Sequence, residues 1–409
     1  QGTHVHRQAA TLFPAWSYCV EDTSFLYPRI PHRGLTDGVS IGEFPLYSYL
    51  LSLPCQLSGQ WDEWSPKIIN LVFLALMMVV WGFFLRVKNW WVWLTLLFFS
   101  QLHLAHHTII HPDGFTLLLI GLSGILFRTN QTTNAGFLGS RSLWAPCLGG
   151  LVFCLAFLIR PYFIPLLWVV APKRKQWMIT FVVCAIGYLI WYKYWISHSE
   201  IKYFATELRT PMELFQQVPL AVGDLIKQIG VNHFNYLGLI FFIIGSRANH
   251  RLWILWIASV AMVLVFKGSH FVHHGYYLFA SATIGVILMY QGFEKATISK
   301  KYLLLGLYAL IGVSLTQHFW HRSRPDYAAL IPKIIEESGM GKNEKLAVYG
   351  SDDPKWLYWA KRTGWLELGA FGGTCVPGAQ FALYFTPQLS SDGAPPSDKE
   401  QIPHLVRCQ

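Results

Sequence analysis

Two carboxylates have positions that suit proton transfer. Asp113 follows a histidine-rich stretch and directly precedes a long apolar run, and Glu43 begins the segment EFPLY. Either carboxylate could take a proton from an attacking hydroxyl group. An unpaired charge beside an apolar run is expensive, so we expect Asp113 to have a partner. The structural alternatives are a helix N-cap for Asp113 and a helix-start acid that interacts with the macrodipole for Glu43.

A lone arginine, Arg160, lies between two apolar stretches and directly precedes Pro161. Its guanidinium offers several N–H donors in a planar fork that suits a phosphate, so Arg160 is the first candidate for binding an anionic group. The alternative is a side chain that only reaches to the edge of a bilayer. Further candidates to line the cavity that would bind this anionic group are Arg7, Lys267, His274 and Tyr277.

Histidines gather before Asp113 and again in the segment HHGYY. Imidazole and carboxylate groups are common metal ligands, so a divalent metal is one interpretation, with His107, His111 and His274 as candidate ligands. The chain holds 16 histidines, however, and they are spread along its length. The interpretation that they only form hydrogen bonds at an interface therefore stays open, and no cofactor is assigned.

The elements that must position these residues are predicted to be membrane helices. Hydrophobic residues make up 53% of the chain, charged residues only 13%, and the mean hydropathy is +0.35. Soluble domains have about 25% charged residues. We therefore predict a polytopic α-helical membrane protein, in which the segment 161–171 is too short to cross alone and is one arm of a broken helix or a re-entrant piece. The predicted spans lie near 67–85, 89–105, 114–127, 143–160, 161–171, 176–195, 232–246, 252–266, 275–292 and 302–318.

The basic residues predict the orientation. The formal charge of +10 is divided among short clusters between the apolar runs, which argues against nucleic acid as a partner. If the spans alternate, the five clusters fall on one face, and the positive-inside rule makes that face cytoplasmic. The segment 197–231 is expected to lie along the interface or to pack on the outer loops. The clusters are Arg86 and Lys88; Arg128 and Arg141; Lys173, Arg174 and Lys175; Arg247 and Arg251; and Lys295, Lys300 and Lys301.

Three domains follow from this division. Residues 1–66 form a first extracytoplasmic loop, before which we expect a further span; residues 67–318 form the transmembrane helical domain; and residues 319–409 form a small extracytoplasmic α/β domain. In the last domain we expect helices near 325–338 and 353–363, strands ending at Gly350 and near 381–385, and loose order over the last dozen residues.

The cysteines divide into two groups. Cys147, Cys154 and Cys184 lie in apolar runs and are expected to be core residues. On the face predicted to be oxidising, Cys19 with Cys55 and Cys375 with Cys408 could each form a disulfide or remain free, because the sequence does not give the distance between them.

Several short motifs occur in a fixed order along nearly the whole chain, and together they resemble a known family. This order is similar to that of membrane glycosyltransferases of the GT-C fold, in particular the bacterial protein O-mannosyltransferase and lipid A aminoarabinose transferase-like family. The motifs are HRQAAT at 6–11, FLYPRI at 25–30, EFPLYSYL at 43–50, HPD at 111–113, IRPY at 159–162, HHGYY at 273–277 and LYWAKRTGW at 357–365.

The resemblance implies an enzyme that passes a sugar from a polyprenyl-phosphate donor to a lipid, glycan or protein acceptor. It implies a location in the bacterial inner membrane, with the active face toward the periplasm, and an acidic residue at the position of Asp113. Such a reaction needs a proton acceptor, a cation or metal beside the departing lipid phosphate, and an apolar groove for the prenyl chain.

The chain departs from the family pattern at Ala10, where many members carry an acidic residue that is the usual candidate for the catalytic base. A methyl group cannot accept a proton. Three interpretations remain: another carboxylate such as Asp37, Glu43 or Asp113 serves; the chain is an engineered inactive variant; or it is a non-catalytic membrane subunit that binds a lipid-linked sugar or scaffolds a protein complex. A transporter is disfavoured, because the polar residues gather at one face and no internal repeat is seen.

Overall fold

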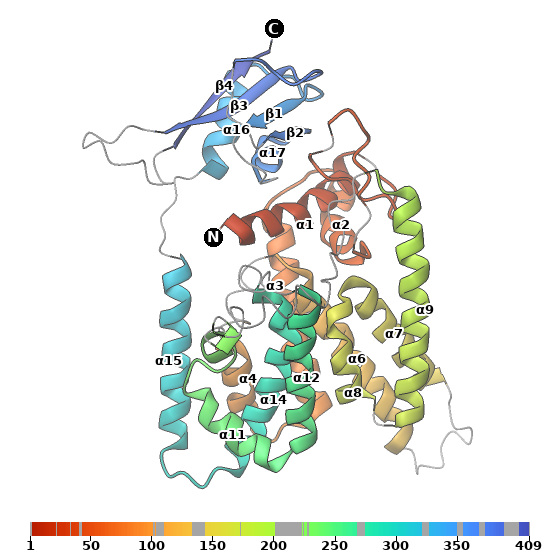
Figure 1. Cartoon of the computed structure of the whole chain (residues 1–409), viewed down its shortest axis with the longest axis vertical. Helices are drawn as coiled ribbons and strands as arrows, with labels where there is room; N and C mark the ends of the chain where they lie inside the picture. The colour runs from red at the N-terminus through yellow and green to blue at the C-terminus, as the bar shows by residue number, and fades with distance from the viewer. Residues whose placement is uncertain are drawn as a thin grey trace, which may run out of the picture. The chain divides into compact units, whose positions relative to one another are not determined.

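A computed structural model of the chain divides into two compact units (Figure 1). Unit 1 comprises residues 1–63, 194–203 and 322–409, and unit 2 comprises residues 64–193 and 204–321. The segments predicted as the first loop and the C-terminal domain thus share one unit. The structure describes residues 2–21, 23–32, 34–40, 43–100, 103, 110–132, 144–171, 173–200, 223, 225–226, 229–267, 275–320, 327–349, 355–367, 373–387 and 401–408.

Unit 2 is helical in its described part. Two of its helices, α3 and α9, are long and apolar enough to cross a membrane, and several shorter helices are also apolar. Every predicted span overlaps a helix, and the short segment 161–171 is indeed a 3-10 helix followed by a single α-helical turn. The elements are α3 (Trp64–Leu85), α4 (Trp90–Phe98), α6 (Pro112–Thr132), α7 (Trp144–Ile159), η1 (Pro161–Leu166), α8 (Leu167–Val170), most of α9 (Arg174–His198), η2 (Ile229–His233), α11 (Gly238–Ala248), α12 (His250–Lys267), η3 (Gly275–Leu278), α14 (Phe279–Lys295) and α15 (Lys301–Trp320).

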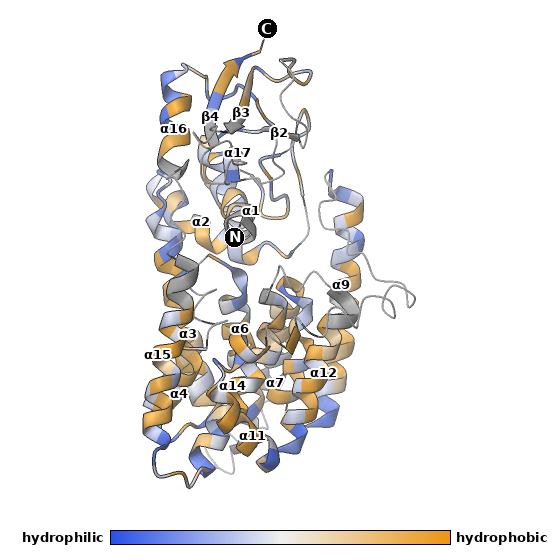
Figure 2. Ribbon diagram, turned by 60° about the vertical axis from the view of Figure 1, so that its left-hand side comes forward, coloured by the Kyte–Doolittle hydropathy of each residue, from blue (hydrophilic) through white to orange (hydrophobic). Residues whose placement is uncertain are grey.

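Helix α14 forms the most buried part of unit 2. Each of its residues from Phe279 to Tyr290 is buried, and it packs against α11, α12 and α4. The contact with α11 is close because Gly245 faces the Leu288 carbonyl and Gly292 faces the Phe241 carbonyl, where a Cβ would collide with the backbone. Small residues of this kind let two apolar helices approach. Figure 2 shows the predominantly hydrophobic colouring of these helices.

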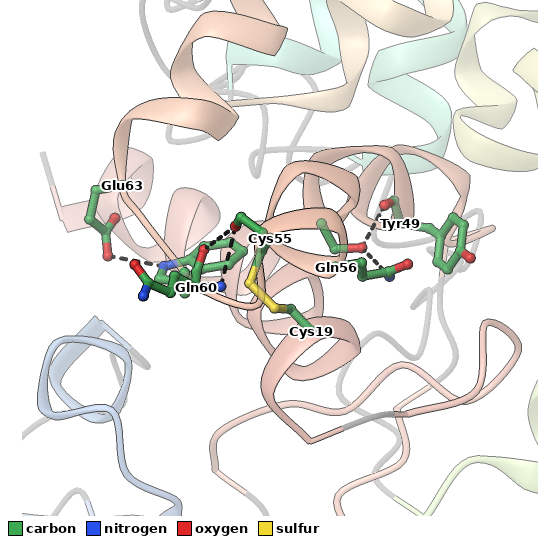
Figure 3. Close-up of a disulfide and its surroundings, with 9 residues drawn as sticks. Cys19, Tyr49, Cys55, Gln56, Gln60 and Glu63 are labelled. Carbon is green, nitrogen blue, oxygen red and sulfur yellow. Dashed lines mark hydrogen bonds between the residues drawn. A yellow bond between two sulfur atoms is a disulfide. The ribbon is translucent and has the colours of Figure 1, made fainter.

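Unit 1 begins with two helices joined by a disulfide. In α1 (Gly2–Val20), Leu12 and Phe13 are buried, and α1 packs on α2 (Leu46–Ser58). Cys19 and Cys55 link the two helices, with their Cα atoms 5.8 Å apart (Figure 3). The segment predicted as a loop is therefore largely helical in its described part, because an apolar stripe on α1 can be buried against α2.

The rest of unit 1 is a mixed four-stranded sheet in the order β2-β1-β3-β4. β1 is parallel to β2 and β3, whereas β4 is antiparallel to β3. One face packs on the helices α16 and α17 through an apolar core that includes Ile331, Leu346, Val348 and Leu357. The elements are α16 (Tyr327–Glu337), β1 (Leu346–Tyr349), α17 (Lys355–Ala360), β2 (Gly364–Glu367), β3 (Phe381–Pro387) and β4 (Gln401–Arg407).

The end of the chain corrects one prediction. Residues 401–407 were expected to be loosely ordered, but they form β4, which pairs with the whole length of β3. A disulfide between Cys375 and Cys408, with Cα atoms 5.8 Å apart, anchors the end of this strand. The physical reason is that the strand satisfies the backbone groups along β3, a long-range pairing that local composition does not reveal. Strand β2 was also missed, since its four residues are too few to show alternation.

Candidate functional site

The first turn of α6 positions Asp113. Pro112 opens the helix, where the missing N–H costs nothing and the fixed φ suits the helical backbone. The hydroxyl of Thr116 donates to the Pro112 carbonyl over 2.9 Å and closes this turn. Asp113 is 1% exposed, so its carboxylate is held inside unit 2. A negative charge at this end of a helix is favoured by the macrodipole.

Pro161 positions Arg160. A residue before proline is pushed out of the helical region, and Arg160 accordingly has φ −143° and ψ 88°. Helix α7 therefore ends at Ile159, and the 3-10 helix η1 begins at the next residue after Arg160. Because the helix ends here, the Arg160 side chain lies in the interior of unit 2, where it is 4% exposed.

The two residues meet in a buried cluster. Arg160 Nε donates to Asp113 Oδ1 over 2.8 Å, and the Tyr162 hydroxyl donates to the same oxygen over 2.6 Å. His111 Nδ1 lies 3.1 Å from Asp113 Oδ2, and His111 Nε2 lies 3.4 Å from Arg160 Nη2. The expectation that Asp113 has a partner is confirmed. A buried charge needs such pairing, because its desolvation is otherwise uncompensated.

An aromatic pair borders this cluster. The rings of Tyr162 and Tyr277 meet edge to face with centroids 5.5 Å apart. Tyr277 is half-buried and belongs to η3, which directly precedes the buried helix α14. The predicted candidates Asp113, Arg160 and Tyr277 are therefore joined through Tyr162.

Within the residues that the structure describes, the cluster offers too few ligands for a divalent cation. Among the described residues no three His, Cys, Asp or Glu side chains form a metal-binding group. The carboxylate of Asp113 and the ring of His111 could supply two ligands, but the Arg160 guanidinium already occupies the position of the cation beside Asp113. A second positive charge at this distance would be repelled.

The remaining predicted residues fall outside this cluster or outside the description. Glu43 belongs to unit 1 and is half-buried. Arg7 is in α1 and Lys267 ends α12, but their side chains are not among those described. His107 and His274 also lie outside the described residues.

Unit 1 contains a second polar cluster that joins the start and the end of the chain. Glu63 accepts hydrogen bonds from Lys361 Nζ over 2.8 Å and from the Tyr358 hydroxyl over 2.9 and 2.8 Å. Burial would raise the pKa of Glu63, but the Lys361 charge and the hydrogen bonds from Lys361, Tyr358 and Trp61 outweigh it and hold the pKa below its ordinary value. Burial and the Glu63 carboxylate raise the pKa of Tyr358 well above its ordinary value, so this hydroxyl stays a donor.

Backbone hydrogen bonds also connect the start of the chain to its C-terminal part. The amide of Gly34 donates to the Gly364 carbonyl over 2.7 Å, and the Gly364 amide donates to the Pro31 carbonyl over 3.0 Å. The first segment thus pairs with the edge of β2 and covers it, as exposed sheet edges require.

Sequence reasoning did not name Tyr162, Tyr358, Lys361 or Glu63 as individual site residues. Tyr162 is the last residue of IRPY, and both Tyr358 and Lys361 lie in LYWAKRTGW. The motifs themselves were the signal that could have identified these three residues. Glu63 belongs to no such motif, and only its contacts reveal it.

No protein-family model matches the chain, and no curated protein matches it. The chain is similar to the crystal structure of ArnT from Cupriavidus metallidurans in the apo state, with 12% identity and a TM-score of 0.42 over 94% of this chain and 88% of that one. It is also similar to the crystal structure of ArnT from Cupriavidus metallidurans bound to undecaprenyl phosphate, with 12% identity and a TM-score of 0.46 over 93% of this chain and 88% of that one.

Proposed function

We propose that this chain is a membrane glycosyltransferase that moves a sugar from a polyprenyl-phosphate donor to a lipid, glycan or protein acceptor. The observation that carries the proposal is the buried pair of Asp113 and Arg160. It unites two motifs, HPD and IRPY, that the sequence resemblance selects and that lie 47 residues apart. Tyr277, from the motif HHGYY, reaches the same cluster through Tyr162.

The geometry favours a binding role for Arg160. A guanidinium suits a phosphate because it presents several N–H donors in a fixed plane. The short contact to Asp113 and the 3.4 Å separation from His111 fix the orientation of that plane. We assign Arg160 to the phosphate of the lipid donor, where it would stabilise the charge that develops as the sugar leaves.

Asp113 is better suited to orienting its neighbours than to taking a proton. Its Oδ1 atom already accepts hydrogen bonds from both Arg160 and Tyr162. We therefore propose Asp113 as a positioning residue. Glu43 remains the candidate for the base that accepts the proton of the acceptor hydroxyl.

The exposed apolar surface of unit 2 supports placement in a membrane. On α9, Ile186, Leu189 and Ile190 are 53%, 64% and 66% exposed, and on α3 Phe83 is 63% exposed. Large apolar surfaces of this extent are rare on soluble proteins. We propose that these faces contact acyl chains, with unit 1 on the periplasmic side of the bacterial inner membrane.

The test is a transfer assay with the purified protein. A polyprenyl-phosphate-linked sugar is incubated with candidate acceptors, and the released polyprenyl phosphate is measured. Arg160→Gln should slow release by roughly 100-fold, the loss typical of removing one donor that stabilises developing charge. Arg251→Gln, a change in a basic cluster of another helix, should leave release unchanged. If no acceptor yields release, and Ala10→Asp does not restore it, the proposed reaction is wrong.

Ala10 favours a second candidate function. Because the family's usual base is replaced by a methyl group, the chain could instead be a non-catalytic subunit that binds the lipid-linked sugar or scaffolds a membrane complex. This function predicts stoichiometric co-purification with another membrane protein and unaltered cellular function of an Asp113→Asn, Glu43→Gln double variant that still folds. The enzyme predicts loss of function in that double variant.

A further inference from the structure

The stretch from Trp64 to Lys193 is almost free of acids. It contains ten lysines and arginines but a single acidic residue, Asp113. Asp113 forms an ion pair with Arg160. The other nine basic residues have no second acidic residue within this stretch, and cations held close together without an anion repel one another.

Two of these cations lie together at the end of α3. Arg86 directly follows the helix with φ 55°, and its amide donates to the Phe83 carbonyl over 3.1 Å. Arg128, from α6, donates through Nη1 to the Phe84 carbonyl and holds its guanidinium 4.0 Å above the centroid of the Phe84 ring. The positive charges of Arg86 and Arg128 act unfavourably on each other.

No carboxylate relieves this repulsion within the residues that the structure describes. The contacts of Arg128 are to a backbone carbonyl and to an aromatic ring, and both are uncharged partners. The carbonyl explains why Arg128 caps the end of α3, as basic residues commonly do. It does not explain why a second arginine is placed beside the first.

Exposed aromatic residues precede and follow Arg86 in the chain, and the turn after it is fixed in place. Phe83 and Trp91 are 63% and 82% exposed. The turn between α3 and α4 is held by the Tyr290 hydroxyl, which accepts hydrogen bonds from the backbone amides of Lys88 over 2.8 Å and Asn89 over 3.2 Å. Two cations at a helix end that also carries exposed aromatic residues are the combination that suits a phosphate headgroup and the adjoining acyl chains.

We propose that Arg86 and Arg128 form a binding site for the phosphate of an anionic phospholipid. This inference rests on the membrane placement proposed above, and it does not depend on sugar transfer. The guanidinium planes would donate to the phosphate oxygens. Phe83 and Trp91 would lie against the chains of the same lipid. The two arginines make no described contact with Asp113, so this site is distinct from the Asp113 cluster.

The experiment measures the binding of phosphatidylglycerol to the full-length protein in mixed micelles that otherwise contain phosphatidylcholine. The Arg86→Gln, Arg128→Gln double variant should bind phosphatidylglycerol roughly 30-fold more weakly, the loss expected for two basic residues at a negative membrane surface. Lys173→Gln, Lys175→Gln is the matched control, since it removes two charges from another predicted basic cluster. Its binding should change less than threefold.

Arg86→Gln alone provides a variant that keeps the α3 cap, because Arg128 makes the capping contact. It should weaken binding to an intermediate degree. Equal losses in the double variant and its control, or no loss in either, would overturn the proposal. Displacement of the lipid by millimolar inorganic phosphate would also overturn it, because the site would then bind a free anion.

Alkaline extraction of membranes separates this proposal from the proposed function. A chain that resists extraction but shows no preference for phosphatidylglycerol contradicts the lipid site alone. A chain that is released by alkali contradicts the membrane placement on which both proposals rest. Transfer of sugar by the double variant at the wild-type rate is expected, since neither arginine belongs to the Asp113 cluster.

Discussion

Arg160 Nε lies 2.8 Å from Asp113 Oδ1 in the interior of unit 2, and both side chains are at most 5% exposed. Neither residue would be tolerated there by itself. Pro161 fixes the position of Arg160 by ending α7, and Pro112 fixes the position of Asp113 by beginning α6. Two prolines in distant parts of the chain thus set the positions of the two charges.

Removing one partner of this pair should be costly. Asp113→Asn or Arg160→Gln leaves a buried charge without its ion-pair partner, which typically costs about 3–5 kcal/mol. We expect a clearly lowered midpoint of thermal unfolding in detergent for each single variant. The Asp113→Asn, Arg160→Gln double variant should lose less than the sum of the two. Strict additivity of the two losses would contradict a direct interaction.

Glu63 should make unit 1 sensitive to acid. Its pKa is lowered in the folded protein, so the unfolded chain binds the proton more readily. The stabilisation is present above the unfolded pKa of about 4.3 and is lost as the pH falls through the folded value. The pH dependence of unfolding between neutrality and pH 3 should therefore be shallower in Glu63→Gln.

The matched control for Glu63 is Glu337→Gln. Glu337 pairs with Lys333 on α16 at 3.8 Å, but both side chains are more than half exposed. Such pairs contribute about 0–1 kcal/mol. If Glu337→Gln alters the acid dependence as much as Glu63→Gln, the cluster of Glu63, Tyr358 and Lys361 has no special role.

The two disulfides predict how many cysteines react with a thiol reagent before and after reduction. Of the seven cysteines, four are in disulfides and Cys147, Cys154 and Cys184 are free. Denatured, unreduced protein should take up three maleimide groups, and reduced protein seven, as measured by intact mass. Cys154 and Cys184 have sulfur atoms 3.0 Å apart, so an uptake of one group would mean that these two are also bonded.

The disulfide at the end of β4 should stabilise the sheet. Replacing both Cys375 and Cys408 by serine should cost unit 1 about 2–4 kcal/mol. We expect the amides of β4 (Gln401–Arg407) to exchange with solvent faster in this variant, as measured by hydrogen exchange with mass spectrometry. Cys147→Ser, at an exposed and unbonded cysteine, should leave that exchange unchanged.

The close packing of α11 on α14 predicts a sensitivity to one methyl group. Gly245→Ala and Gly292→Ala each place a Cβ against a backbone carbonyl, and overpacking of this kind typically costs about 1–3 kcal/mol. Gly306→Ala on α15 is the control, because a Cβ there meets no atom within 4 Å. Thermal unfolding in detergent measures the difference, and equal midpoints for all three variants would contradict the close approach.

The sequence by itself determined the helices of unit 2 and most elements of the small sheet. Apolar runs and the prolines at 112 and 161 are local signals, so they fix where α6 begins and where α7 ends. The same local character explains why Asp113, Arg160 and Tyr277 could be selected as candidates before their positions were known.

Only the tertiary structure decided which of these residues meet. The bonds from Tyr162 to Asp113, from Lys361 to Glu63 and along β4 to β3 each join parts of the chain whose separation no local pattern encodes. Hydrogen bonds and ion pairs act over a few ångströms, so they depend on how the elements pack and not on their order. That is why the motifs could be read in the sequence while their convergence could not.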